Sequence, residues 1–75
     1  MTPNQHQPSY EHATVEWIWE ENAIRINLPD GREIQQGGSY KEVVYILSQL
    51  GHERWEVVSC VGVSNWLFWT LKRSN

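Results

Sequence analysis

The alternation of apolar and polar positions predicts two adjoining strands early in the chain. Val15, Trp17 and Trp19 occupy every second position, and a second alternating run covers residues 24–28. A period of two residues is typical of a β-strand that packs one face on a core. Residues 20–22, Glu-Glu-Asn, separate the two runs and are a turn candidate. We therefore expect an antiparallel hairpin.

A tight turn follows the hairpin at residues 28–31, Leu-Pro-Asp-Gly. Pro29 presets its φ angle, Asp30 can bond its own backbone, and Gly31 tolerates a positive φ. Residues 32–34 can add a short edge strand. The Gln-Gln-Gly-Gly sequence at 35–38 is expected to end this strand pattern.

The clearest element is a helix over residues 39–51. Ser39 and Glu42 have the spacing of a capping box, which satisfies backbone N–H groups of the first turn. Apolar residues at i, i+3, i+4 and i+7 form one stripe, namely Val43, Ile46, Leu47 and Leu50. Gly51 is expected to provide a left-handed C-cap. Such a helix is only about 16 Å long, so it can cover one face of a small sheet.

Two further strands are predicted at residues 55–61 and 65–71. In the second of these, Leu67, Trp69 and Leu71 share one face, and Trp66, Phe68 and Thr70 share the other. The predicted fold is α+β: a small antiparallel sheet of about four strands, in the order β-β-α-β-β, with one helix packed on one face. Residues 1–12 are expected to be a disordered polar leader, and residues 13–75 a single domain.

Composition limits how this chain can be stabilised and what it can bind. A chain of 75 residues is near the lower limit for a single core. One cysteine cannot form an internal disulfide and the histidines are scattered, so we expect no disulfide, metal or cofactor. A net charge of −3 argues against general nucleic-acid binding, and no run approaches the ~20 apolar residues of a membrane span. The free thiol and the missing signal-peptide pattern favour a cytoplasmic location.

A recurring pattern covers residues 46–73. A helix ends in Leu-x-x-Leu-Gly at 47–51, Trp-Glu-x-Val-Ser follows at 55–59, and the last strand closes in Lys-Arg at 72–73. In these features the segment resembles a widespread bacterial domain of unknown function. The resemblance implies a small α+β domain with one helix on an antiparallel sheet, and it implies no activity. Arg54 stands where that family usually has glycine, so if that glycine has a positive φ, either Arg54 is strained or the turn has changed.

Five tryptophans are too many for one short helix to cover. Trp55 directly follows the helix and is expected in the core, but Trp66 and Phe68 face away from Trp69, so the helix cannot cover both sets. Burying one tryptophan removes ~150–250 Å² from water, which is worth several kcal/mol. We therefore expect a second copy of the sheet to pack face to face against the uncovered side, giving a homodimer.

The leading hypothesis is a small, non-enzymatic interaction or regulatory module that acts as a homodimer and binds a protein partner. Its candidate contact residues are Trp17, Trp19, Trp66, Phe68 and Trp69. An enzyme is not expected, because no base or nucleophile converges with another catalytic group. Cys60 in particular is predicted to be an inert, buried thiol.

The alternative is a small-molecule or nucleotide-binding protein. Tryptophans can stack on a ring, and nearby cations can hold a phosphate. The candidate anion contacts are Arg25, Arg32, Lys72 and Arg73.

Overall fold

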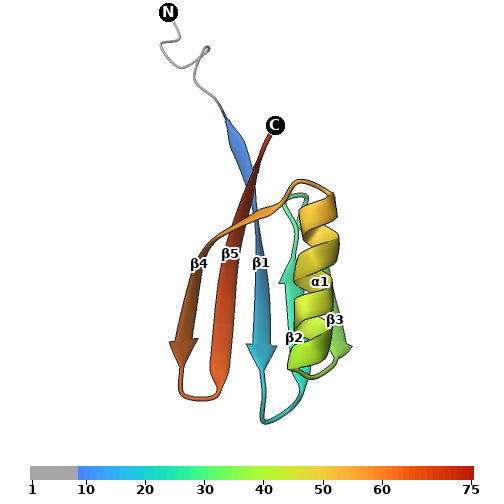
Figure 1. Ribbon diagram of the computed structural model, residues 1–75, viewed down its shortest axis with the longest axis vertical. Coiled ribbons are helices and arrows are strands. Elements are labelled where there is room, and N and C mark those ends of the chain that lie inside the picture. The colour runs from blue at the N-terminus through green and yellow to red at the C-terminus, as the bar shows by residue number, and fades with distance from the viewer. Residues whose placement is uncertain (1–8) are drawn as a thin grey trace, which may run out of the picture.

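The computed structural model describes residues 9–75, which form one antiparallel sheet of five strands and one helix (Figure 1). In chain order the elements are β1 (Tyr10–Ile18), β2 (Ala23–Asn27), β3 (Glu33–Gly37), α1 (Tyr40–His52), β4 (Glu56–Val63) and β5 (Trp66–Ser74). Across the sheet the strands follow the order β3-β2-β1-β5-β4. Figure 1 shows α1 in front of β2 and β3, with β4 at the opposite edge. The predicted α+β class, with one helix on a small sheet, is confirmed.

The sheet has one strand more than the four expected. β3 pairs with β2 from Glu33, opposite Asn27, to Gly37, opposite Ala23. The Gln-Gln-Gly-Gly sequence was predicted to end the strand pattern at residue 35, and this prediction was wrong, because β3 continues to Gly37. Pairing with a neighbouring strand outweighs the weak strand preference of glutamine and glycine, since that preference depends strongly on context.

The first strand also begins earlier than expected. β1 starts at Tyr10, which lies opposite Ser74 of β5, rather than near Ala13. The ammonium group of Lys72 lies 4.5 Å from the centre of the Tyr10 ring. Pairing with β5 thus extends the sheet into the segment expected to be a polar leader. Residues 1–8 of that segment lie outside the described residues.

The core lies between α1 and the sheet face that it covers. Its buried residues are Ala13, Val15, Ile24, Ile26, Val43, Ile46, Trp55, Trp69 and Leu71. Val43 and Ile46 come from the predicted helical stripe, while Leu47 and Leu50 pack against this core at partial burial. Trp55 is buried, as predicted. Among residues 9–75, β3 and β4 contribute no buried side chain, so the core occupies only part of the sheet.

The helix begins where the capping box was predicted. The carboxylate of Glu42 accepts hydrogen bonds from the backbone N–H of Ser39 at 2.7 Å and from its hydroxyl at 2.6 Å. These hydrogen bonds hold the pKa of the Glu42 carboxyl below its ordinary value of 4.5. The ionised carboxylate therefore supports the first turn at neutral pH.

The helix ends later than predicted. Gly51 lies inside α1, and the residue with a left-handed backbone is Arg54, with φ of 73°. The N–H groups of Arg54 and Trp55 donate to the carbonyls of Gly51 and Leu50, at 2.9 and 3.0 Å. This pair of bonds is a Schellman motif, and Trp55 and Leu50 supply its usual apolar contact. Because Trp55 directly follows the cap residue and packs in the core, the helix ends with its left-handed residue at Arg54 rather than at Gly51.

Arg54→Gly is expected to raise the free energy of unfolding by about 1 kcal/mol. A non-glycine residue in the left-handed region costs about 1–2 kcal/mol of folding free energy. Glycine removes this strain, but part of the gain is lost because glycine makes the unfolded chain more flexible. Urea unfolding followed by circular dichroism measures the change. Arg54→Ala is the control, because it removes the guanidinium group and keeps the strained φ. Equal stabilisation by alanine would show that charge, rather than backbone strain, is the cause.

Candidate interaction surface

The sheet face turned away from α1, here called the open face, consists of rows of residues that run from β3 to β4. Directly paired residues on neighbouring strands point to the same face. The middle row is Gln35, Arg25, Glu16, Phe68 and Val61; the rows beside it are Gly37, Ala23, Ile18, Trp66 and Val63, and Glu33, Asn27, Thr14, Thr70 and Ser59. In the first two rows, side chains change from small or polar over β2 and β3 to apolar over β4 and β5.

The apolar half of the open face is a continuous patch, here called the apolar strip, formed by Ile18, Val61, Val63, Trp66 and Phe68. The rings of Trp66 and Phe68 meet edge to face, with centroids 5.3 Å apart. Val61 and Val63 are 51% and 54% exposed, and the other three side chains are half-buried. Because α1 packs on the other face, nothing in residues 9–75 lies over this strip (Figure 1).

A hydrogen-bonded network borders the apolar strip on the side of β1 and β2. The Glu16 carboxylate accepts hydrogen bonds from the indole N–H of Trp66 and from the amide of Asn27, both at 3.2 Å. Arg25 lies 3.9 Å from this carboxylate and 3.3 Å from that of Glu33. The indole of Trp66 is therefore held in place by a polar partner, and the charges beside it are paired within the sheet.

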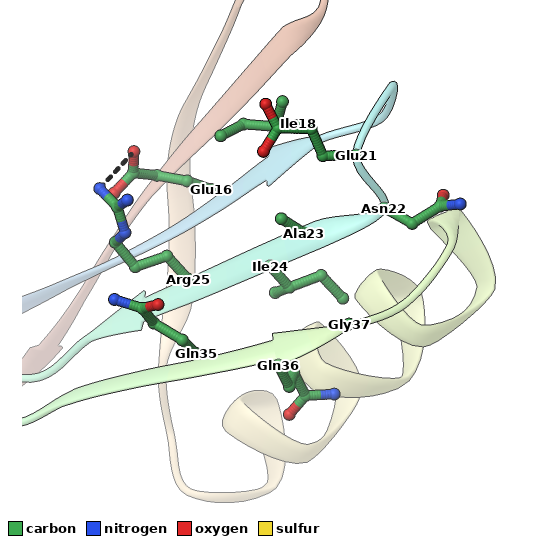
Figure 2. A pocket seen from close by; sticks show the side chains of 10 residues that line it. All are labelled: Glu16, Ile18, Glu21, Asn22, Ala23, Ile24, Arg25, Gln35, Gln36 and Gly37. Atoms are coloured by element: carbon green, nitrogen blue, oxygen red, sulfur yellow. Dashed lines mark ion pairs between the residues drawn. The ribbon is translucent and has the colours of Figure 1, made fainter.

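A hollow of about 340 Å³ opens in the polar half of the open face (Figure 2). Ala23 and Gly37 lie opposite each other on β2 and β3, and their small size leaves space beside the longer side chains of Arg25 and Gln35. In Figure 2 the Glu16–Arg25 ion pair closes one end of this space. The volume is near the lower limit for ligand pockets, about 300–1,000 Å³. It gives the open face a depression next to the apolar strip.

Strand β4 is exposed along its whole length. It is the edge of the sheet farthest from α1, and Val57 and Val58 are 46% and 47% exposed. Cys60 is exposed as well, so the prediction of a buried thiol was wrong. The physical reason is the position of the short helix, whose core partners come from β1, β2 and β5, so that both faces of β4 stay uncovered.

The predicted contact residues do not share one surface. Trp66 and Phe68 lie on the open face, but Trp69 is only 7% exposed and belongs to the core, so its inclusion as a contact residue was wrong. Trp69 points the opposite way from its neighbours because side chains alternate along a strand.

The other two predicted contact residues lie near the start of α1. The indole N–H of Trp17 donates to the carbonyl of Gly38 at 3.1 Å, and its ring tilts against that of Tyr40, 5.5 Å away. Trp19, 39% exposed, packs beside Trp17 with ring centroids 5.9 Å apart. These two tryptophans therefore pack at the end of β1 on the sheet face that α1 covers, and they do not belong to the apolar strip.

The four predicted anion contacts also lie apart. Arg32 pairs with Asp30 within the tight turn at 2.8 Å, and its hydrogen bonds lower the pKa of the Asp30 carboxyl. Lys72 lies over the ring of Tyr10, and Arg25 joins the Glu16 network. The guanidinium group of Arg73 lies 4.4 Å from the centre of the Trp55 ring, and its Nε donates to Glu11 at 2.8 Å. Each cation therefore already has a partner in its own part of the fold.

Arg32 and Arg73 do line one further cavity of about 340 Å³. It lies beside the C-terminal half of α1, and its apolar wall includes Leu28, Ile46 and Leu50. This cavity is the position that best fits the small-molecule hypothesis. The carboxylates of Asp30 and Glu11 already pair with its two guanidinium groups, which weakens the attraction for an added anion.

Three members of the apolar strip were missed by the sequence reading. Ile18 lies between Trp17 and Trp19, on the opposite strand face from these two, and Val61 and Val63 were not recognised as neighbours of Trp66 and Phe68. The available signal was the density of valine in residues 57–63, which places valines on both faces of one strand.

Within residues 9–75, no three His, Cys, Asp or Glu side chains lie close enough together to hold a metal ion. The one helix of this region is too short and too polar to cross a membrane. No protein-family model, no curated protein and no solved structure matches the chain, so the geometry of the sheet is the guide to its function.

Proposed function

We propose that this chain is a small, non-enzymatic interaction module that associates with a second copy of itself through the apolar strip. One observation carries the proposal: Val61, Val63, Trp66 and Phe68 form a contiguous apolar surface on a face with no cover. Contiguous apolar patches on small soluble domains typically mark binding surfaces. The role in binding or regulating a further protein, and the cytoplasmic location, remain part of the same proposal.

Face-to-face packing suits the position of the strip. A two-fold axis that runs across the strands sets β5 of one copy over β5 of the other, so that apolar residues meet apolar residues. The network of Glu16, Arg25 and Glu33 lies beside the apolar contact, and the hollow over β2 and β3 leaves room for water around its charges. Trp66 adds little entropic cost on binding, because Glu16 already orients its indole.

Phe68→Lys is expected to weaken self-association by at least about tenfold, because it removes an aromatic anchor and places two like charges near the two-fold axis. Size-exclusion chromatography with light scattering, over a dilution series, measures the effect. Circular dichroism verifies that the variant is folded.

Thr70→Lys is the matched control, since Thr70 is on the same strand and the same face but next to polar Thr14 and Ser59. We expect it to leave association close to that of the wild-type chain. A wild-type chain that stays monomeric at micromolar concentration contradicts the proposal. An equal loss of association from Thr70→Lys contradicts the assignment to the strip.

A further inference from the structure

The two edges of the sheet differ in how well they are protected. Edge strands expose unpaired backbone N–H and C=O groups, and soluble proteins usually guard them with charges, proline, short length or bulges. The edge strand β3 is short and carries Glu33, Gln35 and Gln36. In contrast, β4 has no charged residue and no proline from Val57 to Val63, and only one irregularity, between Val57 and Ser59. β4 is thus an edge that can accept another strand.

Pairing of β4 with itself is restricted by symmetry. A two-fold axis perpendicular to the sheet keeps each side chain on its own face, and directly opposed residues of an antiparallel pair also share a face. The axis must therefore pass through a residue pair and not between two pairs. The regular part of β4 is Ser59–Val63, after the irregularity, and its middle residue is Val61.

An axis at Val61 gives an acceptable set of neighbours. Val61 lies opposite Val61 of the second copy, Cys60 opposite Gly62, and Ser59 opposite Val63. All are uncharged, so two chains of net charge −3 meet here without opposing like charges. The paired length of five residues equals that of the β2–β3 pair within the sheet. Pairing of β4 with β3 of another copy, in contrast, brings in Glu33 and builds an open chain of subunits.

We propose that β4 pairs antiparallel with β4 of a second copy, with Val61 at the two-fold axis, to form one continuous sheet. This contact is made by the backbone edge of β4 and is separate from the face contact of the apolar strip. It rests on the proposed function in one respect, namely that this chain associates with copies of itself. The two axes are perpendicular, because one lies across the strands and the other is normal to the sheet. Where they intersect, the assembly closes as a tetramer of about 35 kDa from chains of 8.8 kDa.

Disulfide trapping tests the register. In a Cys60→Ser background, Val61→Cys places two thiols opposite each other, within the ~4.4–6.8 Å between Cα atoms that a disulfide requires. Val57→Cys is the matched control, because Val57 is a similarly exposed valine of β4 that the pairing separates from its copy by roughly 25 Å. Under mild oxidation we expect the Val61→Cys chain to form dimers at least about tenfold faster than the Val57→Cys chain. Equal crosslinking rates for the two variants overturn the pairing. The absence of crosslinking in both variants also overturns it, and this is the result expected if β4 naturally pairs with a strand of another protein.

Light scattering of Phe68→Lys separates this inference from the proposed function. If both contacts exist, the wild-type chain is a tetramer and Phe68→Lys is a dimer that still crosslinks through Val61→Cys. A monomeric Phe68→Lys chain overturns the β4 pairing and leaves the strip contact standing. A Phe68→Lys chain with the mass of the wild-type assembly overturns the strip contact, and a monomeric wild-type chain overturns both.

Discussion

Trp69→Ala is expected to lower the free energy of unfolding by about 3–5 kcal/mol, the usual cost of truncating a buried aromatic side chain. Trp69 lies in the row between Val15 and Cys60, and its indole fills the core beneath α1 at 7% exposure. A small domain has a total stability of about 5–15 kcal/mol, so this one change can leave a large fraction of the chain unfolded. Urea unfolding followed by far-ultraviolet circular dichroism, at one fixed protein concentration, measures the loss.

Trp19→Ala is the matched control for that experiment. Trp19 lies in the turn directly after β1, is 39% exposed and packs on Trp17. We expect its truncation to cost about 1 kcal/mol or less, because much of its surface is already in water. If both variants lose similar stability, Trp69 is not the core residue described above.

Gly38→Ala is expected to destabilise the protein by about 1–3 kcal/mol, the range of added methyl groups in packed sites. A Cβ atom at Gly38 would lie 2.8 Å from Cβ of Glu42 and 2.8 Å from Cδ1 of Ile24. Ile24 is buried and Glu42 is in the first helical turn, so neither can move freely. Two hydrogen bonds would be displaced together: the one that the Gly38 N–H donates to the Asn22 carbonyl at 2.7 Å, and the one that the Trp17 indole donates to the Gly38 carbonyl.

Gly37→Ala tests whether close packing at Gly38 is the cause. Gly37 is the adjacent glycine, and a Cβ atom there would meet its nearest neighbour, the backbone oxygen of Asn22, at an ordinary 3.6 Å. We expect a change in unfolding free energy within about 0.5 kcal/mol. Thermal unfolding of both variants, with tryptophan fluorescence to report on Trp17, makes the comparison. A Gly37→Ala chain as unstable as Gly38→Ala would point to a general need for glycine flexibility in this segment.

The local elements could be predicted because their signals are local. The helical stripe of Val43 and Ile46, the positive φ of Gly31 in the tight turn, and the opposite orientations of Trp66 and Leu67 all follow from spacing and turn chemistry. Arg54 is a further case, since its positive φ was expected only if the glycine usual at that position has a positive φ. In each case a few neighbouring residues determine the conformation.

The arrangement of the sheet could not be predicted in this way. Which strand lies next to β1 depends on the packing of the whole chain, and the alternation in β1 is the same whether its neighbour is β5 or another strand. For the same reason the sequence could not show that α1 leaves β4 uncovered, and Cys60 was assigned to the interior. The candidate surface was therefore found only in part: Trp66 and Phe68 follow from alternation, whereas Val61 and Val63 join them only through the pairing of β4 with β5.

The pairing of β1 with β5 also determines when this domain can form during protein synthesis. Among the strands of this sheet, β1 is translated first and β5, one of its two neighbours, is translated last. Until residue 74 has left the ribosomal tunnel, the nascent chain can hold only the β1–β2–β3 meander with α1, and Leu71 and Trp69 are missing from the core. Folding of this domain on the ribosome is therefore expected to be a single late event rather than a stepwise one.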